Sequence, residues 1–97
     1  MWQIKIHRLV VDEDFKKINK HDRSLIIKTI YKKLSIAPEK YGTHLHSKLK
    51  GYWKIKITHY RVIYRIEKGS ILVLVLKVGM RREEAVYKEM LQRIKKL

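Results

Sequence analysis

The chain has 97 residues, of which 24 are lysine or arginine and nine are aspartate or glutamate, so its formal net charge is +15. The 45% hydrophobic content and single proline predict one globular domain over residues 1–97 and exclude a disordered chain. Without cysteine there is no disulfide scaffold or thiolate metal site, and no apolar run approaches the roughly 20 residues that span a bilayer. We therefore expect a cytoplasmic protein with no membrane contact, whose partner is a polyanion such as nucleic acid, or an acidic protein.

The N-terminal part predicts a strand followed by a short helix. Residues 2–8 alternate apolar and polar side chains, which is the period of a strand. Asp12 stands where a helix N-cap is expected, and Phe15 and Ile18 follow it one helical turn apart. The pattern predicts a short helix over about residues 13–19.

A second helix follows, with Asp22 as its possible cap. Apolar residues recur every four positions along one face of this segment: Ile26, Ile30 and Leu34. The helix should stop near Pro38, and the polar residues 39–49 are expected to form a loop over the sheet edge.

The second half of the chain predicts three strands and a last helix. The strands are expected over residues 52–57, 60–66 and 71–76. The third is apolar on both faces, which indicates a central strand covered on each side. Gly79 is expected to end it, before a helix over residues 83–96.

The resulting order, β-α-α-β-β-β-α, predicts an α+β fold with a small, mostly antiparallel, four-stranded sheet and its helices packed on one face. The other face of the sheet is expected to stay open and to carry cations.

Those cations follow the strand period. Lys54 and Lys56 share one face of the predicted strand over residues 52–57. If Thr58 and His59 form a tight turn, Lys56 lies directly opposite Arg61. Thr-His is not a favoured two-residue turn, however, and a loop one residue longer would place Arg61 on the other face.

Charged residues on a strand of a basic protein can simply occupy a solvent face. Several cations that converge on one patch instead favour phosphate binding. Lys48 and Lys50 upstream and Arg65 downstream extend this patch and are candidate RNA-binding residues.

A second cluster, Arg81 and Arg82, precedes the last helix. The N-terminus of a helix already carries positive potential, so arginines there suit a bound anion, although long solvated side chains also tolerate the position. Tyr87, in the first or second turn, could fill the core or stack on an unpaired base.

The histidines give a weaker signal. His44 and His46 have the spacing of a pair of metal ligands, but no carboxylate or cysteine partner is near them in the sequence, so we expect no metal and no cofactor. His59, at the tip of the basic hairpin, is kept as an accessory candidate.

These stretches, in this order, resemble the RelE family of ribosome-dependent mRNA interferase toxins within the RelE/ParE superfamily. The resemblance covers nearly the whole chain and is sharpest at KLKG (48–51), YWKIK (52–56), YRVIY (60–64), VGMR (78–81) and VY (86–87). It implies a metal-independent endoribonuclease that cuts mRNA in the ribosomal A site by attack of a 2′-hydroxyl on the adjacent phosphate, leaving a 2′,3′-cyclic phosphate and a 5′-hydroxyl end.

The resemblance also implies a role for each candidate catalytic residue. Lys56 would be the general base, Lys54 and Arg61 would stabilise the charged phosphorane, Arg81 would serve the leaving oxygen, and Tyr87 would stack on or orient the mRNA. A lysine is a poor base at neutral pH unless neighbouring cations favour its neutral form. Arginine is effectively never deprotonated in proteins, which suits Arg81 to charge stabilisation.

The sequence departs from the family pattern in two places. Lys50 stands where the best-known members have arginine, and the Thr58-His59 tip is short. The family further implies a cognate acidic, RelB-like antitoxin as partner. Two alternatives stay open: a ParE-type toxin that inhibits gyrase without cleaving RNA, and a basic RNA-binding module without catalysis.

Overall fold

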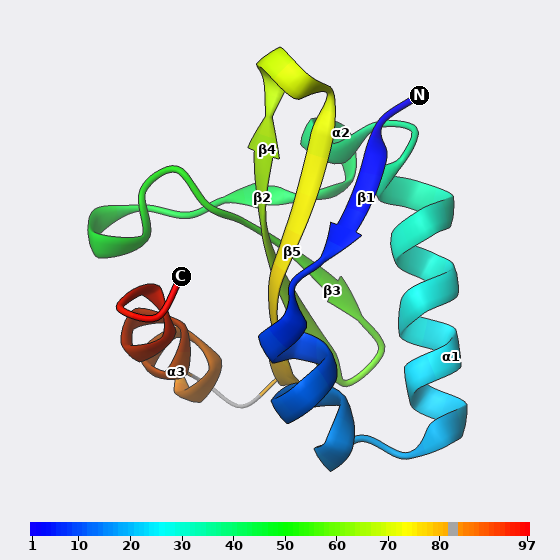
Figure 1. The fold of residues 1–97 in the computed structure, drawn as a ribbon, viewed down its shortest axis with the longest axis vertical. Helices are drawn as coiled ribbons and strands as arrows, with labels where there is room; N and C mark the ends of the chain where they lie inside the picture. Colours follow the sequence, from blue (N-terminus) through cyan, green and yellow to red (C-terminus); the bar gives the residue numbers. More distant parts are fainter. Residues whose placement is uncertain (82–83) are drawn as a thin grey trace.

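A computed structural model describes residues 1–81 and 84–97. The chain forms one mixed five-stranded sheet in the order β1-β5-β4-β3-β2, with β1 parallel to β5 and the other pairs antiparallel (Figure 1). The strands are β1 (Gln3–Ile6), β2 (Thr43–His44), β3 (Trp53–Ile57), β4 (Tyr60–Glu67) and β5 (Leu72–Met80). The α+β class is confirmed, but the sheet has five strands where four were predicted.

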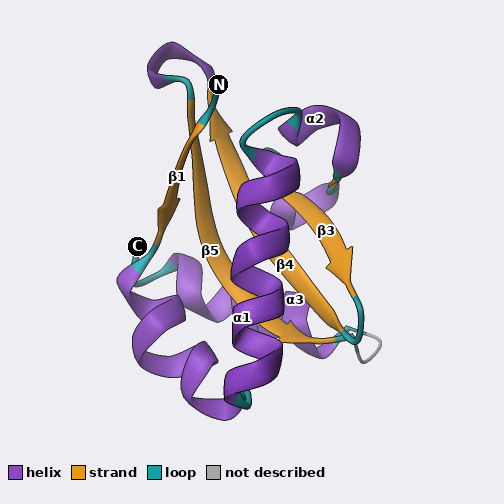
Figure 2. Ribbon diagram, turned by 90° about the vertical axis from the view of Figure 1, so that its right-hand side faces the viewer, coloured by secondary structure: helices purple, strands orange, loops and turns teal. Residues whose placement is uncertain are grey.

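The helices lie on both sides of this sheet. They are α1 (Lys20–Thr29), which continues as a wider turn through Ile30–Leu34, α2 (Pro38–Tyr41) and α3 (Ala85–Ile94), with short helical turns at Val10–Asp14, Phe15–Lys17, Ser47–Leu49 and Lys68–Ser70. Figures 1 and 2 show α1 on one face of the sheet and α3 on the other. Within the described residues, every helix is too short or too polar to serve as a membrane span.

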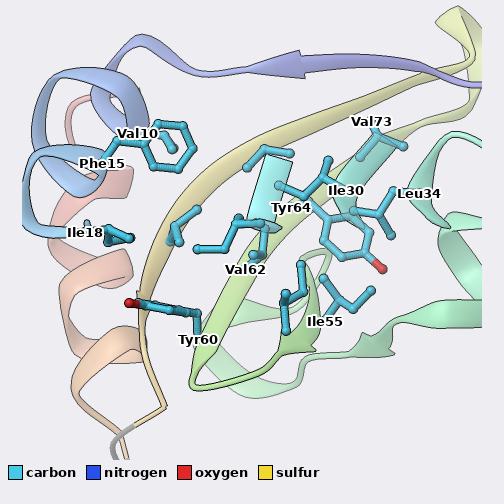
Figure 3. Close-up of a cluster of buried hydrophobic side chains, with 14 residues drawn as sticks. Val10, Phe15, Ile18, Ile30, Leu34, Ile55, Tyr60, Val62, Tyr64 and Val73 are labelled. Carbon is cyan, nitrogen blue, oxygen red and sulfur yellow. The ribbon is translucent and has the colours of Figure 1, made fainter. Parts of the chain in front are cut away.

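The prediction that all helices pack on one face was therefore wrong. One buried cluster packs the α1 side against the sheet through residues such as Ile30, Val62 and Tyr64 (Figure 3). A second cluster joins Ile63 of β4 to Met90 of α3 on the opposite face. β5 lies between β1 and β4 and is apolar on both faces, as predicted for a central strand, so both faces need a cover.

Both predicted N-caps were displaced by residues upstream. Helical backbone begins at Arg8, where His7 Nδ1 accepts a hydrogen bond from the Leu9 amide at 3.1 Å. The cap of α1 is Asn19, whose side-chain oxygen accepts from the Asp22 amide at 2.8 Å. Asp22 thus lies in the first turn, where the helix dipole stabilises its negative charge, but Asp22 is not the cap.

Two further boundaries differ from the sequence prediction. Residues 39–49 were expected to form a loop, but they contain most of α2 and all of β2, the fifth strand.

β5 does not end at Gly79 but runs to Met80, and Gly79 pairs with Arg61. A side chain at Gly79 would meet Val86 of α3, since a Cβ there lies 2.9 Å from the Val86 Cγ2. This glycine therefore allows helix and strand to approach closely. The predicted start of the last helix, at residue 83, lies outside the described residues.

Buried charges connect three segments of the fold. Arg93 of α3 is 5% exposed and donates to both carboxylate oxygens of buried Asp14, at 2.7 and 2.8 Å. Lys77 of β5 reaches the same carboxylate at 3.1 Å and Glu89 at 3.2 Å. Burial by itself would lower the pKa of Arg93, but the hydrogen bonds and charge of Asp14 outweigh it and raise that pKa. The ion pairs fix α3 against the sheet.

Candidate nucleic-acid interface

The β3–β4 hairpin has the register that the cationic face requires. Thr58 and His59 form a two-residue turn, and Lys56 is directly paired with Arg61. Thr58 adopts a positive φ of 50°, which is unfavourable for a β-branched residue. The conditional prediction for this turn is confirmed. Since like charges placed opposite each other destabilise a sheet, this arrangement favours a binding role over a purely structural one.

Four of the five predicted catalytic residues line one open groove of about 1,070 Å³ between the hairpin and the start of α3. They are Lys54, Arg61, Arg81 and Tyr87. The correction to the fold explains how they meet: α3 covers part of the face that was expected to be open, and this brings Tyr87 beside the strand cations. We call this hollow the cationic groove.

Tyr87 is held by two of these cations. Lys54 Nζ donates to the Tyr87 hydroxyl at 3.0 Å, and the Arg61 guanidinium lies 5.1 Å from the centre of the tyrosine ring. Tyr87 is half-buried. Its hydroxyl accepts from Lys54, which leaves the hydroxyl proton available to a bound oxygen anion.

Arg81 is placed by the hairpin tip. Its main-chain amide donates to the His59 carbonyl at 2.7 Å, and its guanidinium approaches the Thr58 carbonyl at 3.5 Å. His59 and Arg81 also line a small hollow beside the groove. The accessory role of the His59 side chain stays a prediction.

Lys56, the fifth predicted catalytic residue, is not among the residues that line the cationic groove. It is exposed, pairs with Arg61, and lines a neighbouring hollow at the sheet edge together with Lys54. The structure thus brings four of the candidate catalytic residues into the cationic groove and places Lys56 opposite one of them, Arg61, on the neighbouring strand.

The candidate RNA-binding residues are more dispersed. Lys48 and Lys50 are exposed at and after the Ser47–Leu49 turn, and Arg65 is exposed on β4 with its guanidinium 2.6 Å from Glu67. These three are not among the residues that line the cationic groove. Arg82 lies outside the described residues. Their contribution to RNA binding stays a prediction.

Sequence reasoning missed two charged residues of the groove. Glu84 and Lys88 line the groove with Tyr87, while Val86 and Met90 face the core. The spacing of Glu84 and Lys88, four residues apart on one helix face, was the available signal. Among the described residues, the groove therefore holds four cations and one carboxylate.

A hydrogen bond ties the hairpin to α1. The Tyr60 hydroxyl donates to Asp22 at 2.7 Å. This bond is the main reason that the pKa of Asp22 lies below its ordinary value and the pKa of Tyr60 above it. Tyr60 precedes Arg61, so the bond helps to fix the strand that carries the groove cations.

His44 of β2 and His46, two residues later, make aromatic contacts. The His44 and His46 rings pack edge to face with centroids 5.6 Å apart, and His44 packs against Trp53 at 5.1 Å. These contacts account for the pair structurally.

Comparison with known proteins places this chain in a class of small toxins. A family model for the ParE toxin of type II toxin-antitoxin systems matches residues 4–85. The chain belongs to this family, within the RelE/ParE superfamily. No curated protein matches the sequence.

Solved structures of RelE toxins have the same fold. The toxin-antitoxin complex RelBE2 of Mycobacterium tuberculosis contains a chain with a TM-score of 0.77 and 22% identity, covering 82% of this chain and 98% of that one. The isolated Escherichia coli RelE toxin gives 0.68 and 20%, covering 97% and 99%. A chain of the archaeal RelE-RelB complex of Pyrococcus horikoshii gives 0.57 and 23%, covering 84% and 97%.

Proposed function

We propose that this toxin is a metal-independent endoribonuclease that cuts mRNA in the ribosomal A site and thereby inhibits translation. The observation that carries the proposal is the convergence of Lys54, Arg61, Arg81 and Tyr87 on the cationic groove, with Lys56 paired to Arg61 across the hairpin. Preorganised cations that stabilise developing charge commonly contribute more to the acceleration of phosphoryl transfer than any other group in a site.

The reaction uses the RNA's own nucleophile. The 2′-hydroxyl oxygen forms a bond to the adjacent phosphorus, its proton passes to the Lys56 amine, and the bond from phosphorus to the 5′-oxygen breaks. The leaving oxygen takes up a solvent proton, so the products are a 2′,3′-cyclic phosphate and a 5′-hydroxyl. The Lys56 amine must be neutral to accept the proton.

The remaining groups stabilise charge and orient the RNA. Lys54 and Arg61 flank Tyr87 and would face the non-bridging oxygens of the phosphorane. Arg81 would stabilise the charge that develops on the leaving oxygen, since a guanidinium does not give up its proton. The Tyr87 ring would stack on a base next to the cleaved bond.

The protein's partners follow from the same charge. A surface with a formal net charge of +15 suits the ribosome and its mRNA, as well as a cognate acidic antitoxin of the RelB kind in the cytoplasm. RelE-RelB complexes among the solved structures support an antitoxin partner.

The direct test is end mapping on ribosomes. An end-labelled message on programmed ribosomes should be cut in the A site by the native protein, and Arg81→Ala should lower the rate by about 10²- to 10³-fold. Intact message at high toxin excess would refute the proposal.

Gyrase inhibition is the second candidate, because the matching family model describes ParE toxins. It predicts loss of DNA supercoiling on addition of the protein, with no cut in ribosome-bound message. A supercoiling rate that is insensitive to the protein would dismiss it.

A non-catalytic RNA-binding module is the third candidate. Under it, Lys56→Arg, which keeps the charge but removes an amine that can become neutral, would leave activity unchanged. Selective loss of cleavage with retained ribosome binding would exclude the module.

A further inference from the structure

A second hollow adjoins the cationic groove at the edge of the sheet. It has a volume of about 260 Å³ and is lined by Lys33, Tyr41, Thr43, Lys54, Ile55 and Lys56. Lys54 lines both the cationic groove and this hollow, so the two are neighbours. We call it the edge hollow.

The edge hollow combines an aromatic ring with cations. Tyr41, at the end of α2, is 44% exposed, although large aromatic side chains are usually well buried. Lys33 Nζ lies 5.6 Å from the centre of its ring, and exposed Lys56 reaches the hollow from β3. An aromatic face beside cations is the combination that holds an unpaired base and its phosphate.

The strand edge adds main-chain groups. Thr43 of β2 pairs with Lys54, and in the described part of the chain no strand pairs with that edge of β3 beyond this point. An edge strand presents amide and carbonyl groups, so the main chain from Ile55 onward can reach the edge of a bound base. The hollow is smaller than the roughly 300–1,000 Å³ of typical sites for drug-sized ligands, which favours a single base.

We propose that the edge hollow is a subsite for one nucleotide flanking the cleaved bond, with its base stacked on Tyr41 and its phosphate held by Lys33 and Lys56. The proposal rests on the function proposed above and extends it, because it makes the toxin read an RNA segment longer than the two nucleotides that react. Single-stranded RNA would run from the cationic groove past Lys54 to Tyr41.

The chain provides matched controls. Tyr31 is another exposed tyrosine, 49% exposed, and lies in the same helical turn as Lys33. Lys32 is an exposed neighbour of Lys33. Neither residue is among those that line the edge hollow.

The test measures binding of a fluorescent single-stranded RNA hexanucleotide by anisotropy, with an abasic nucleotide placed at each position in turn. Tyr41→Ala should weaken binding of the intact RNA by about 5- to 150-fold, the range for one stacked base. One abasic position should abolish the difference between Tyr41→Ala and the native protein. Tyr31→Ala should stay within twofold of the native affinity.

Salt dependence tests the phosphate contact. Lys33→Ala should reduce the slope of log affinity against log salt by about 0.7, the value for one phosphate of a single strand, whereas Lys32→Ala should not change it. Equal effects of Tyr41→Ala and Tyr31→Ala, an effect of Tyr41→Ala that persists at every abasic position, or failure of the native protein to bind the RNA would each overturn the proposal.

The ribosome assay separates the two proposals. If the message stays intact while the abasic effect is present, the subsite stands as an RNA-binding feature and the nuclease proposal falls. If the message is cut but Tyr41→Ala behaves like Tyr31→Ala, only the subsite falls.

Discussion

Replacing Arg93 by methionine should strongly destabilise the fold. The guanidinium is 5% exposed and makes two hydrogen bonds to Asp14, one to the Leu76 carbonyl and one to Glu13. Methionine keeps the apolar stem but leaves the Asp14 carboxylate buried without its main partner. Removing one member of a buried pair typically costs about 3–5 kcal/mol.

The lower end of this range is expected here. Asp14 keeps its hydrogen bonds from Lys77, at 3.1 Å, and from the Val78 amide, at 2.8 Å. A loss of about 3 kcal/mol corresponds to a fall in Tm of roughly 12–24 °C for a domain of this size. Urea unfolding followed by tryptophan fluorescence, with Trp2 and Trp53 as reporters, gives the free energy directly.

Arg65→Met is the matched control. The Arg65–Glu67 pair is as short, at 2.6 Å, but its side chains are 44% and 40% exposed, so its loss should cost at most about 1 kcal/mol. The double variant with Asp14→Asn should be less destabilised than the sum of the single changes and serves if Arg93→Met alone is too unstable to purify. Equal losses for Arg93→Met and Arg65→Met would refute the reasoning, because burial would then not decide the strength of the pair.

Three further outcomes are expected. Lys56→Gln should raise the free energy of unfolding by about 0.2–1 kcal/mol in urea titration, since it removes repulsion from Arg61, while it abolishes cleavage on ribosomes. Burial raises the pKa of Tyr64 above its ordinary value, so the unfolded chain loses the phenol proton at a lower pH than the folded protein. The free energy of unfolding should therefore fall above about pH 10, by up to about 1.4 kcal/mol per pH unit, and this fall should be less steep in Tyr64→Phe. Gly79→Ala should cost about 1–3 kcal/mol because its Cβ would strike α3, whereas Gly69→Ala, with no heavy atom within 4 Å of its Cβ, should change the urea midpoint little.

The hairpin was predictable because its information is local. The alternation of Lys54 and Lys56 with isoleucine sets the face of β3, and a two-residue connection sets the register with Arg61. The same local pattern placed Tyr87 in the first turn of α3. The strand cations could therefore be grouped from the local pattern, whereas Arg81 and Tyr87 were grouped with them only through the family resemblance.

The missed features depend on distant residues or on very short elements. Asp14 and Arg93 are 79 positions apart, and no periodicity links them. Lys77 interrupts an apolar run, so the predicted strand ended at residue 76, whereas β5 continues to Met80 because the Lys77 ammonium is paired with buried Asp14. The two-residue strand Thr43–His44 is too short to show an alternation.

The one-sided fold was wrong for a related reason. Patterning showed that the last helix has an apolar stripe, but not which face of the sheet that stripe covers. The close approach of Val86 to Gly79 places α3 beside the cations, so the surface that was expected to be open is one wall of a groove.

The proposed chemistry requires that the cationic groove activates the RNA's own 2′-hydroxyl toward the neighbouring phosphate. This requirement is tested by cleavage of ribosome-bound messages that carry a single 2′-deoxynucleotide, either immediately before the cut bond or one position away. We expect no cleavage of the first message, and cleavage of the second that leaves a cyclic phosphate. Cutting of the first message at the native rate would contradict the proposed chemistry.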